Sequence, residues 1–161
     1  MAITVTTDEI YHAFYADYLA GKAFMHSHTY SGNPLGCSAS LAVLKQLREE
    51  DILEKANLQA QYLHKQLCKN LLEHPNVGEI RTIGLINAIE LVKDKHTKET
   101  FNEKLRIGYQ IYKDALENGL ILRPLGDVLY FNPPLIIEKN DIDQAISICV
   151  RSIENILPQS L

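Results

Sequence analysis

The sequence predicts an α+β fold in which helices cover a small antiparallel sheet. Apolar residues recur at helical spacing in several long segments, which indicates amphipathic helices. Short β-prone runs lie close together in the second half of the chain, and strands joined by short connections favour antiparallel pairing. Apolar residues make up 46% of the 161 residues and charged residues 22%, so a globular chain with a substantial core is expected.

The first part of the chain predicts two helices with an irregular segment between them. Thr7 carries the hydroxyl of a helix cap and is followed by two acids, so a helix is expected from there to Gly21. Residues 23–32 are too irregular for a helix and are expected to form a short strand and a loop. Asn33 and Pro34 then begin a second helix, with Asn33 as the cap and Pro34 in the first turn.

A long helix and a pair of strands are expected next. The helix opens at Asp51, carries leucines and alanines on one side, and ends at residues 74–76, which contain a proline. Residues 77–92 are interrupted by Gly78 and Gly84. They predict two strands or one bent strand, mostly buried.

Two more helices complete the expected fold. After a polar loop over residues 94–101, a helix runs to Glu117 and is stopped by Gly119. The final helix is expected to begin with Asn140 as its cap and to extend to Leu157.

A hairpin between these helices carries a candidate ligand-binding arginine. Residues 120–122 are expected to form a short strand that pairs, through a turn at Gly126, with residues 128–131. Arg123 at the end of a buried strand needs an anionic partner, either a substrate carboxylate or an internal acid. Tyr130 either presents its hydroxyl near the same place or is a plain core aromatic.

The segment around residues 26–35 is the other candidate site. It places hydroxyls and backbone N–H groups before a helix N-terminus, which attracts phosphate, and Thr29 adds a donor. The alternative is a well-capped helix after a polar loop. His26 and His28 share one face of an extended segment, but zinc needs two further ligands and none stands at suitable spacing. We therefore expect no metal site; a general base or a structural histidine remain open.

Composition argues against several other classes. The net charge is −4 with acids and bases interspersed, which argues against nucleic acid as a partner. There is no apolar run of about 18 residues, so no membrane span is expected, and no secretory signal stands at the N-terminus. The cysteines are distant from one another (Cys37, Cys68 and Cys149), which favours reduced thiols in the cytoplasm over disulfides or zinc.

Four segments together resemble the class III aminotransferases. Residues 28–37 read H-T-Y-S-G-N-P-L-G-C and are similar to the family's H-T-Y-x-G-N-P-L-A-C signature. Residues 84–91, G-L-I-N-A-I-E-L, resemble its G-L-M-x-G-I-E-L strand. Residues 122–134 resemble its closing R-P, Tyr and P-P segment, and residues 6–11 resemble the stretch that follows its catalytic lysine. The order of the motifs is the family's, and the match spans nearly the whole chain.

This resemblance implies the C-terminal part of a fold type I pyridoxal-phosphate transferase. Residues 1–50 would be a stub of the large cofactor-binding domain, and residues 51–161 the small α+β domain. The resemblance assigns Thr29 and the Tyr30 backbone to the cofactor phosphate of the neighbouring subunit in a homodimer. The family's Schiff-base lysine would lie before Met1, so no catalytic residue is expected within this chain, and we expect it to be inactive alone.

The resemblance also implies a substrate. Within the family the chain is most similar to the biotin-pathway members, which convert 8-amino-7-oxononanoate with S-adenosylmethionine or lysine as amino donor. It assigns Arg123 to the substrate carboxylate with Tyr130 nearby, and His28 and Ser27 to the mouth of the site. Ornithine, acetylornithine or 4-aminobutyrate aminotransferases are the alternatives within the family. A non-catalytic α+β binding or oligomerisation domain is the alternative outside it.

Overall fold

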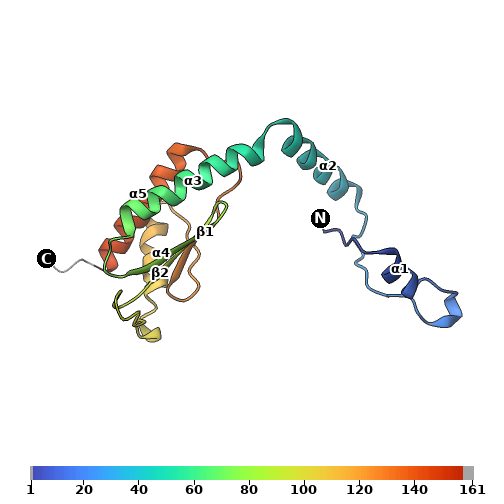
Figure 1. Cartoon of the computed structure of the whole chain (residues 1–161), viewed down its shortest axis with the longest axis horizontal. Helices are drawn as coiled ribbons and strands as arrows, with labels where there is room; N and C mark the ends of the chain where they lie inside the picture. Colours follow the sequence, from blue (N-terminus) through green and yellow to red (C-terminus); the bar gives the residue numbers. More distant parts are fainter. Residues whose placement is uncertain (1, 158–161) are drawn as a thin grey trace. The chain divides into compact units, whose positions relative to one another are not determined.

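The computed structural model describes residues 2–157, and the chain divides into two compact units, Met1–Glu50 and Asp51–Leu161 (Figure 1). The predicted ranges 1–50 and 51–161 also include Met1 and residues 158–161, which lie outside the described residues. We call the two parts unit 1 and unit 2.

The described part of unit 1, residues 2–50, contains three helices and begins with a short one. They are α1 (Asp8–Phe14), the 3₁₀ helix η1 (Tyr18–Ala20) and α2 (Pro34–Glu49). The Thr7 hydroxyl accepts the N–H of Ile10 at 3.4 Å, as its predicted role as a cap requires. The expectation that this helix continues to Gly21 is wrong, because the backbone becomes extended at Tyr15. No residue of α1 is buried, so packing does not extend the helix beyond what its cap supports.

The predicted strand within residues 23–32 does not form among the described residues. A strand needs a neighbour to accept its backbone hydrogen bonds, and this segment has only local ones, such as His26 N–H to the Phe24 carbonyl at 2.9 Å. Alternate residues nevertheless bring their rings together along the chain. Successive ring contacts join Phe24, His26, His28 and Tyr30.

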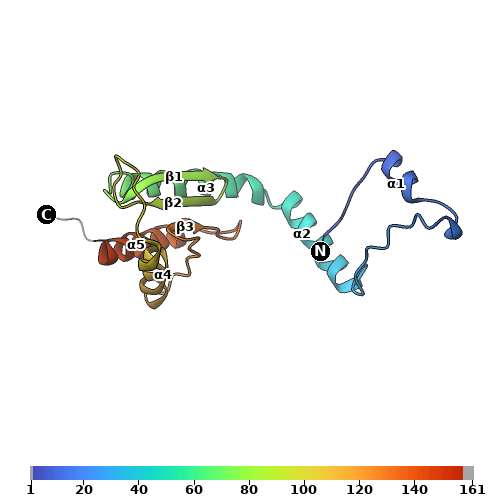
Figure 2. The same ribbon diagram turned by 90° about the horizontal axis from the view of Figure 1, so that it is seen from below.

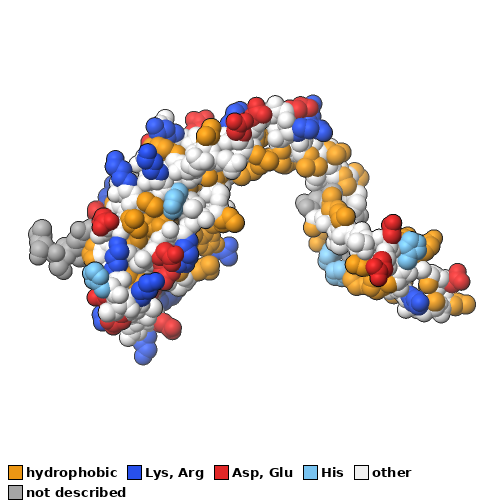
Figure 3. All heavy atoms as spheres, in the orientation of Figure 1, with side chains coloured by type: hydrophobic (Ala, Val, Ile, Leu, Met, Phe, Trp, Pro, Cys, Tyr) orange, Lys and Arg blue, Asp and Glu red, His pale blue; other side chains and the backbone are white. Residues whose placement is uncertain are grey.

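Helix α2 begins as predicted, but its apolar side is exposed. The Asn33 side-chain oxygen accepts the N–H groups of Leu35 at 2.9 Å and Gly36 at 3.2 Å, and Pro34 is the first helical residue. Figure 3 shows hydrophobic side chains gathered along α2. The large ones with more than half of their surface exposed are Leu35, Leu41, Val43 and Leu44. None of the described residues of unit 1 is buried, so this unit has no core of its own within that range.

Unit 2 is a two-layer α+β domain, as the sequence predicts. Its strands follow one another in the order β1-β2-β3, and both pairs are antiparallel (Figure 2). In Figure 1 helices α3 and α5 lie side by side, and α4 packs against α5. The elements are α3 (Ile52–Leu71), β1 (Val77–Ile83), β2 (Ile86–Leu91), the 3₁₀ helix η2 (Glu103–Leu105), α4 (Ile107–Glu117), β3 (Val128–Phe131) and α5 (Lys139–Ile156).

The core lies between the sheet and the helices. On β2, Asn87, Ile89 and Leu91 are buried, whereas Ala88 and Glu90 between them are partly exposed. This alternation means that the helices cover one face of the sheet and leave the other open. Fully buried side chains from every layer meet there, including Leu63, Leu67, Ile89, Ile111, Leu129, Ile142 and Ile153.

The first predicted strand region forms two strands joined at Gly84, whose φ is 55°. The expectation that this region is mostly buried is wrong for β1, which has only Val77 fully buried. The reason is position, because β1 is an edge strand with a neighbouring strand on one side only, and Ile83 at its end is 77% exposed.

The predicted strand at residues 120–122 is absent from the described structure. Leu120 donates its N–H to the Ala115 carbonyl at 2.9 Å, so the segment begins as the end of α4 rather than as a ladder. Strand β3 pairs with β2 instead. The turn at Gly126 does form, and Leu125 and Val128 exchange backbone hydrogen bonds across it at 2.9 and 3.1 Å.

The last helix begins slightly earlier than predicted. Its cap is Glu138 and its first residue Lys139, so Asn140 lies inside the helix and caps nothing. The helix ends at Ile156, and Leu157 closes it as a buried residue.

Candidate functional site

The first group of predicted site residues lies in a tight turn before α2. The carbonyl of His28 accepts the N–H of Ser31 at 2.9 Å, and the Ser31 hydroxyl accepts the N–H of His28 at 3.2 Å. The carbonyl of Tyr30 accepts the N–H of Asn33 at 3.1 Å. These bonds hold Thr29 at the tip of the turn, in an exposed position.

The donors open to an anion are those of the turn and not those of the helix end. Asn33 already occupies the N–H groups of Leu35 and Gly36, which a helix N-terminus would otherwise offer to phosphate. Within residues 2–157, no acceptor bonds the backbone N–H of Thr29 or Tyr30 or the Thr29 hydroxyl. Two amides and a hydroxyl on one exposed turn fit the oxygens of a phosphate.

The neighbouring predicted residues differ in how they are held. The rings of His28 and Tyr30 are stacked, with centroids 5.2 Å apart and an interplanar angle of 2°. They form a flat, exposed aromatic surface beside the open donors. Ser27 is exposed and makes no hydrogen bond to any other described residue.

The second group lies in unit 2, on the turn that precedes β3. Arg123 follows the buried Leu122 but is itself exposed. No ion pair or hydrogen bond joins it to another residue in the described part of the chain, so the internal acid considered as its partner is not found there. The premise of a buried strand end is also wrong, because residues 120–122 are not a strand.

Arg123 and Tyr130 flank the same turn. The bridge between Leu125 and Val128 closes it, and Arg123 and Tyr130 each lie two residues beyond that bridge, one on each arm. Tyr130 lies opposite Ala88 of β2 on the partly exposed face of the sheet and is itself half-buried. Tyr130 is therefore not a fully buried core aromatic, which was the alternative interpretation of this residue.

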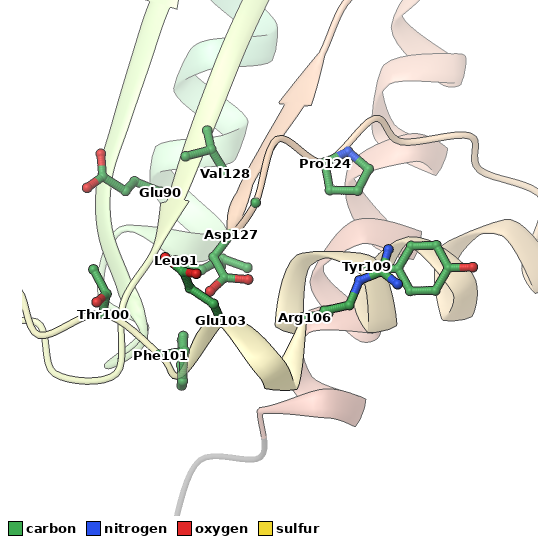
Figure 4. A pocket seen from close by; sticks show the side chains of 11 residues that line it. Glu90, Leu91, Thr100, Phe101, Glu103, Arg106, Tyr109, Pro124, Asp127 and Val128 are labelled. Carbon is green, nitrogen blue, oxygen red and sulfur yellow. The ribbon is translucent and has the colours of Figure 1, made fainter.

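Sequence reasoning missed a hollow in unit 2. A cavity of about 560 Å³ is lined by Glu90, Leu91, Thr100, Phe101, Glu103, Arg106, Tyr109, Pro124, Gly126, Asp127 and Val128. Figure 4 shows the Arg106 side chain extending to the ring of Tyr109, with the guanidinium carbon 4.2 Å from the ring centroid. None of the predicted site residues lines it, although Pro124 directly follows Arg123. The lining comes from distant segments of the chain, so no local motif could have revealed it.

The small antiparallel sheet covered by helices defines the class, because solved members of the fold type I pyridoxal-phosphate transferases match this fold. The family model of the class III aminotransferases matches residues 1–153. The chain therefore belongs to the class III aminotransferases, which are pyridoxal-phosphate-dependent transferases.

Individual relatives carry more specific names. The adenosylmethionine-8-amino-7-oxononanoate aminotransferase of Geobacter sulfurreducens is 38% identical over 97% of this chain and 34% of its own length. The enzyme of that name from Methanocaldococcus jannaschii is 42% identical over 88% of the chain and 31% of its own. The putrescine–pyruvate aminotransferase of Pseudomonas aeruginosa is 39% identical over 83% and 29%.

Solved structures of aminotransferases also match this chain. A crystal structure of the M. jannaschii enzyme matches with a TM-score of 0.86 at 38% identity, over 93% of this chain and 34% of that one. The PMP-bound form of an aminotransferase from Vibrio fluvialis matches with a TM-score of 0.81 at 31% identity, over 89% and 31%. The chain thus spans about a third of the length of the relatives that it matches. No helix among residues 2–157 combines the length and apolarity needed to cross a membrane.

Proposed function

We propose that the chain is the C-terminal part of an adenosylmethionine-8-amino-7-oxononanoate aminotransferase, which transaminates 8-amino-7-oxononanoate to 7,8-diaminononanoate in biotin synthesis. Unit 1 would belong to the large domain and unit 2 would be the small domain. The observation that carries this proposal is the match to a relative of that name along 97% of the chain. The enzyme would be cytoplasmic, and its cysteines would be reduced thiols.

In this proposal the turn before α2 holds the phosphate of the cofactor. Pyridoxal phosphate supplies an electron sink for amino-group transfer when it is bound. The Thr29 hydroxyl and the N–H groups of Thr29 and Tyr30 would donate to its phosphate, from one subunit to the site of the other. The open donors of this turn support the assignment, as does the PMP-bound form of the V. fluvialis relative.

Arg123 would bind the substrate carboxylate. Its guanidinium has no protein partner in the described chain, and a carboxylate can take two of its parallel N–H groups. Tyr130 on the other arm of the turn would add its hydroxyl, and His28 and Ser27 would line the mouth of the site. These residues would position 8-amino-7-oxononanoate for reaction with an amino donor, S-adenosylmethionine or lysine.

The assembly would be a homodimer of the complete enzyme. Unit 1 exposes the apolar side of α2 and has no buried residue within the described range. Apolar surface of this extent marks an interface. The remainder of the enzyme and a second subunit would cover it.

We infer that this chain alone forms no imine with the cofactor at a unique lysine. The test is a titration of the pure chain with pyridoxal phosphate, followed by borohydride reduction and peptide mapping. Scattered substoichiometric labelling of lysines is the expected result. One lysine reduced at stoichiometric yield would contradict the inference and would require the site to be redrawn.

A chimera tests the substrate. The chain replaces the corresponding third of the M. jannaschii relative, and turnover is measured with 8-amino-7-oxononanoate and, separately, with putrescine and pyruvate. The second pair is included because of the 39% identity with the P. aeruginosa enzyme. Preference for 8-amino-7-oxononanoate is expected, and preference for putrescine would replace the proposal.

The same chimera tests the arginine. Arg123→Met should lower kcat/KM for 8-amino-7-oxononanoate about 10- to 100-fold, the loss of one hydrogen-bonded charge pair. Arg48→Met, at another exposed arginine, should leave it unchanged. Equal activity of the two variants would remove Arg123 from the site.

A further inference from the structure

We propose that Asp127 is a positioning residue for the carboxylate site, because its side chain fixes the turn from which Arg123 reaches the substrate. The inference rests on the proposed function, which gives Arg123 that task. Asp127 would touch no substrate itself. It would act through Arg123, which precedes it by four residues on the same turn.

Arg123 has no side-chain contact that could hold it in place. It is exposed, and no hydrogen bond or ion pair joins it to another residue between positions 2 and 157. Its position therefore depends on the residues on either side. Before it, Leu122 is buried in the core with 3% of its surface exposed. After it, the chain passes through the exposed Leu125 and Gly126 and is fixed to the rest of unit 2 at Asp127.

Asp127 connects the turn to three elements of unit 2. Its side-chain Oδ1 accepts the N–H of Gly108 at the start of α4, at 2.9 Å. Its backbone carbonyl accepts the N–H of Leu91 at the end of β2, also at 2.9 Å. Strand β3 begins directly after it, at Val128. A single half-buried residue thus joins the turn to α4, β2 and β3.

The bond to Gly108 is a helix cap supplied by a distant segment. Arg106, the residue before α4, makes no side-chain cap bond, and its side chain extends to the ring of Tyr109 (Figure 4). A capping oxygen usually accepts the N–H of the second or third helical residue, and Gly108 is the second residue of α4. A carboxylate also interacts favourably with the positive end of the helix dipole. Helix α4 and the turn therefore hold each other.

The packing around this bond leaves the turn little freedom. The carbonyl of Gly126 lies against Gly108, in the space that a Cβ would occupy. Without the Asp127 carboxylate the turn would keep the bridge between Leu125 and Val128 but lose its side-chain bond to α4. Arg123 would then be distributed over several positions. A group that must first be ordered binds its ligand more weakly.

The kinetic effect should fall on substrate binding. In 8-amino-7-oxononanoate the carboxylate and the carbonyl that is transaminated lie towards opposite ends of the molecule. A contact that is made equally in the ground state and in the transition state changes KM and leaves kcat unchanged. Release of Arg123 should therefore raise KM for this substrate.

The test uses the chimera in which this chain completes the M. jannaschii relative. Asp127→Ala should raise KM for 8-amino-7-oxononanoate about tenfold and change kcat by less than about twofold. Asp127→Asn keeps an oxygen in the capping position and should restore KM to within about twofold of the unsubstituted chimera. Glu103→Ala is the matched control and should leave KM unchanged. It removes a carboxylate that lines the same cavity but bonds no other residue of the described chain.

A double variant separates positioning from a general loss of stability. If Asp127 acts through Arg123, Asp127→Ala should add nothing to the effect of Arg123→Met on KM, whereas independent effects would multiply. Hydrogen exchange of the full chain provides a second measurement. In Asp127→Ala the amides of Leu125 and Val128, which bond each other across the turn, should exchange faster. The amide of the buried Leu67 should not change.

The possible failures differ from one another. The inference alone is overturned if Asp127→Ala leaves KM unchanged, if Asp127→Asn does not restore it, or if the two effects multiply in the double variant. Unchanged kcat/KM in Arg123→Met would remove the carboxylate site and the positioning role with it. Should Asp127→Ala prevent folding, Asp127→Glu takes its place. It keeps the charge but moves the oxygens away from the Gly108 amide, so unchanged KM in that variant would equally overturn the inference.

Discussion

Gly108 at the start of α4 and Asp127 on the turn before β3 are in direct contact across 19 residues of sequence, with the Gly108 N–H donating to Oδ1 of Asp127 at 2.9 Å. The carbonyl of Gly126 fills the space beside Gly108 where any other residue would carry its Cβ. This contact ties the turn that carries Arg123 and Tyr130 to a helix of the core. The position of the predicted carboxylate site thus depends on a residue with no side chain.

Gly108→Ala should therefore destabilise unit 2. The new Cβ would overlap the Gly126 carbonyl oxygen, and backbone cannot move aside as a side chain can. We expect a loss of about 3 kcal/mol in the free energy of unfolding by urea. Gly78→Ala is the comparison, since its Cβ meets only a Val92 methyl at 2.9 Å and should cost less. Equal losses of unfolding free energy in the two variants would show that the turn at Gly126 shifts to make room for the new Cβ.

The core of unit 2 should respond to truncation according to burial along one helix. Leu67 and Leu58 both lie on α3, but Leu67 has no exposed surface and Leu58 is 62% exposed. Leu67→Ala should lower the free energy of unfolding by about 2–5 kcal/mol, from lost burial and a cavity. Leu58→Ala should change it by less than about 0.5 kcal/mol. Similar values for both would mean that α3 packs differently.

His74 should make stability depend on pH. Burial lowers the pKa of His74 below its ordinary 6.5, and its Nδ1 accepts the Asn76 N–H at 3.1 Å, a bond that protonation would break. The unfolded state therefore binds the proton first, so stability is lost as pH falls through about 6.5 towards the lower folded-state value. Thermal melts at pH 7.5 and 5.5 should show this loss.

The matching variants are His74→Gln and His96→Gln. The first should flatten the pH dependence between those two melts, because it removes the buried titrating group. The second changes an exposed histidine and should leave the dependence intact. A slope that survives His74→Gln would assign the effect to other groups.

Asn33 should control the order of the turn and the start of α2. Asn33→Ala removes the acceptor of two amides, and loss of such a cap costs about 1 kcal/mol of helix stability. Hydrogen exchange at Leu35 and Gly36 should speed up, as followed by NMR. Asn70→Ala, near the end of α3, should not affect these amides. Unchanged exchange would show that the helix end is held by other contacts.

The chain alone should self-associate through the apolar side of α2. Leu41 and Leu44 are 68% and 59% exposed, and unit 1 buries no residue in its described range. Light scattering should report a dimer or a larger species, which Leu41→Glu should shift towards monomer. Lys45→Glu on the same helix controls for the added acid. If the chain without substitutions is already a monomer, the expected association is contradicted.

Much of the local structure could be predicted from the sequence. Thr7 and Asn33 cap helices because each brings a side-chain oxygen within reach of amides two or three residues away. Gly84 and Gly126 mark turns because their positive φ suits a residue without Cβ. The helices of unit 2 follow from the period of their apolar residues. The open donors at Thr29 come from the same motif that suggested a phosphate site.

Tertiary structure decided the rest, because it depends on which distant segments supply partners. β3 pairs with β2 and not with residues 120–122, because the Leu120 amide already bonds the end of α4. No pattern along the chain brings Asn87 to His64, or Asp127 to Gly108. What the sequence determined are contacts within a few residues, set by backbone geometry. What only the tertiary structure decided are contacts that form when the helices pack on the sheet and exclude water.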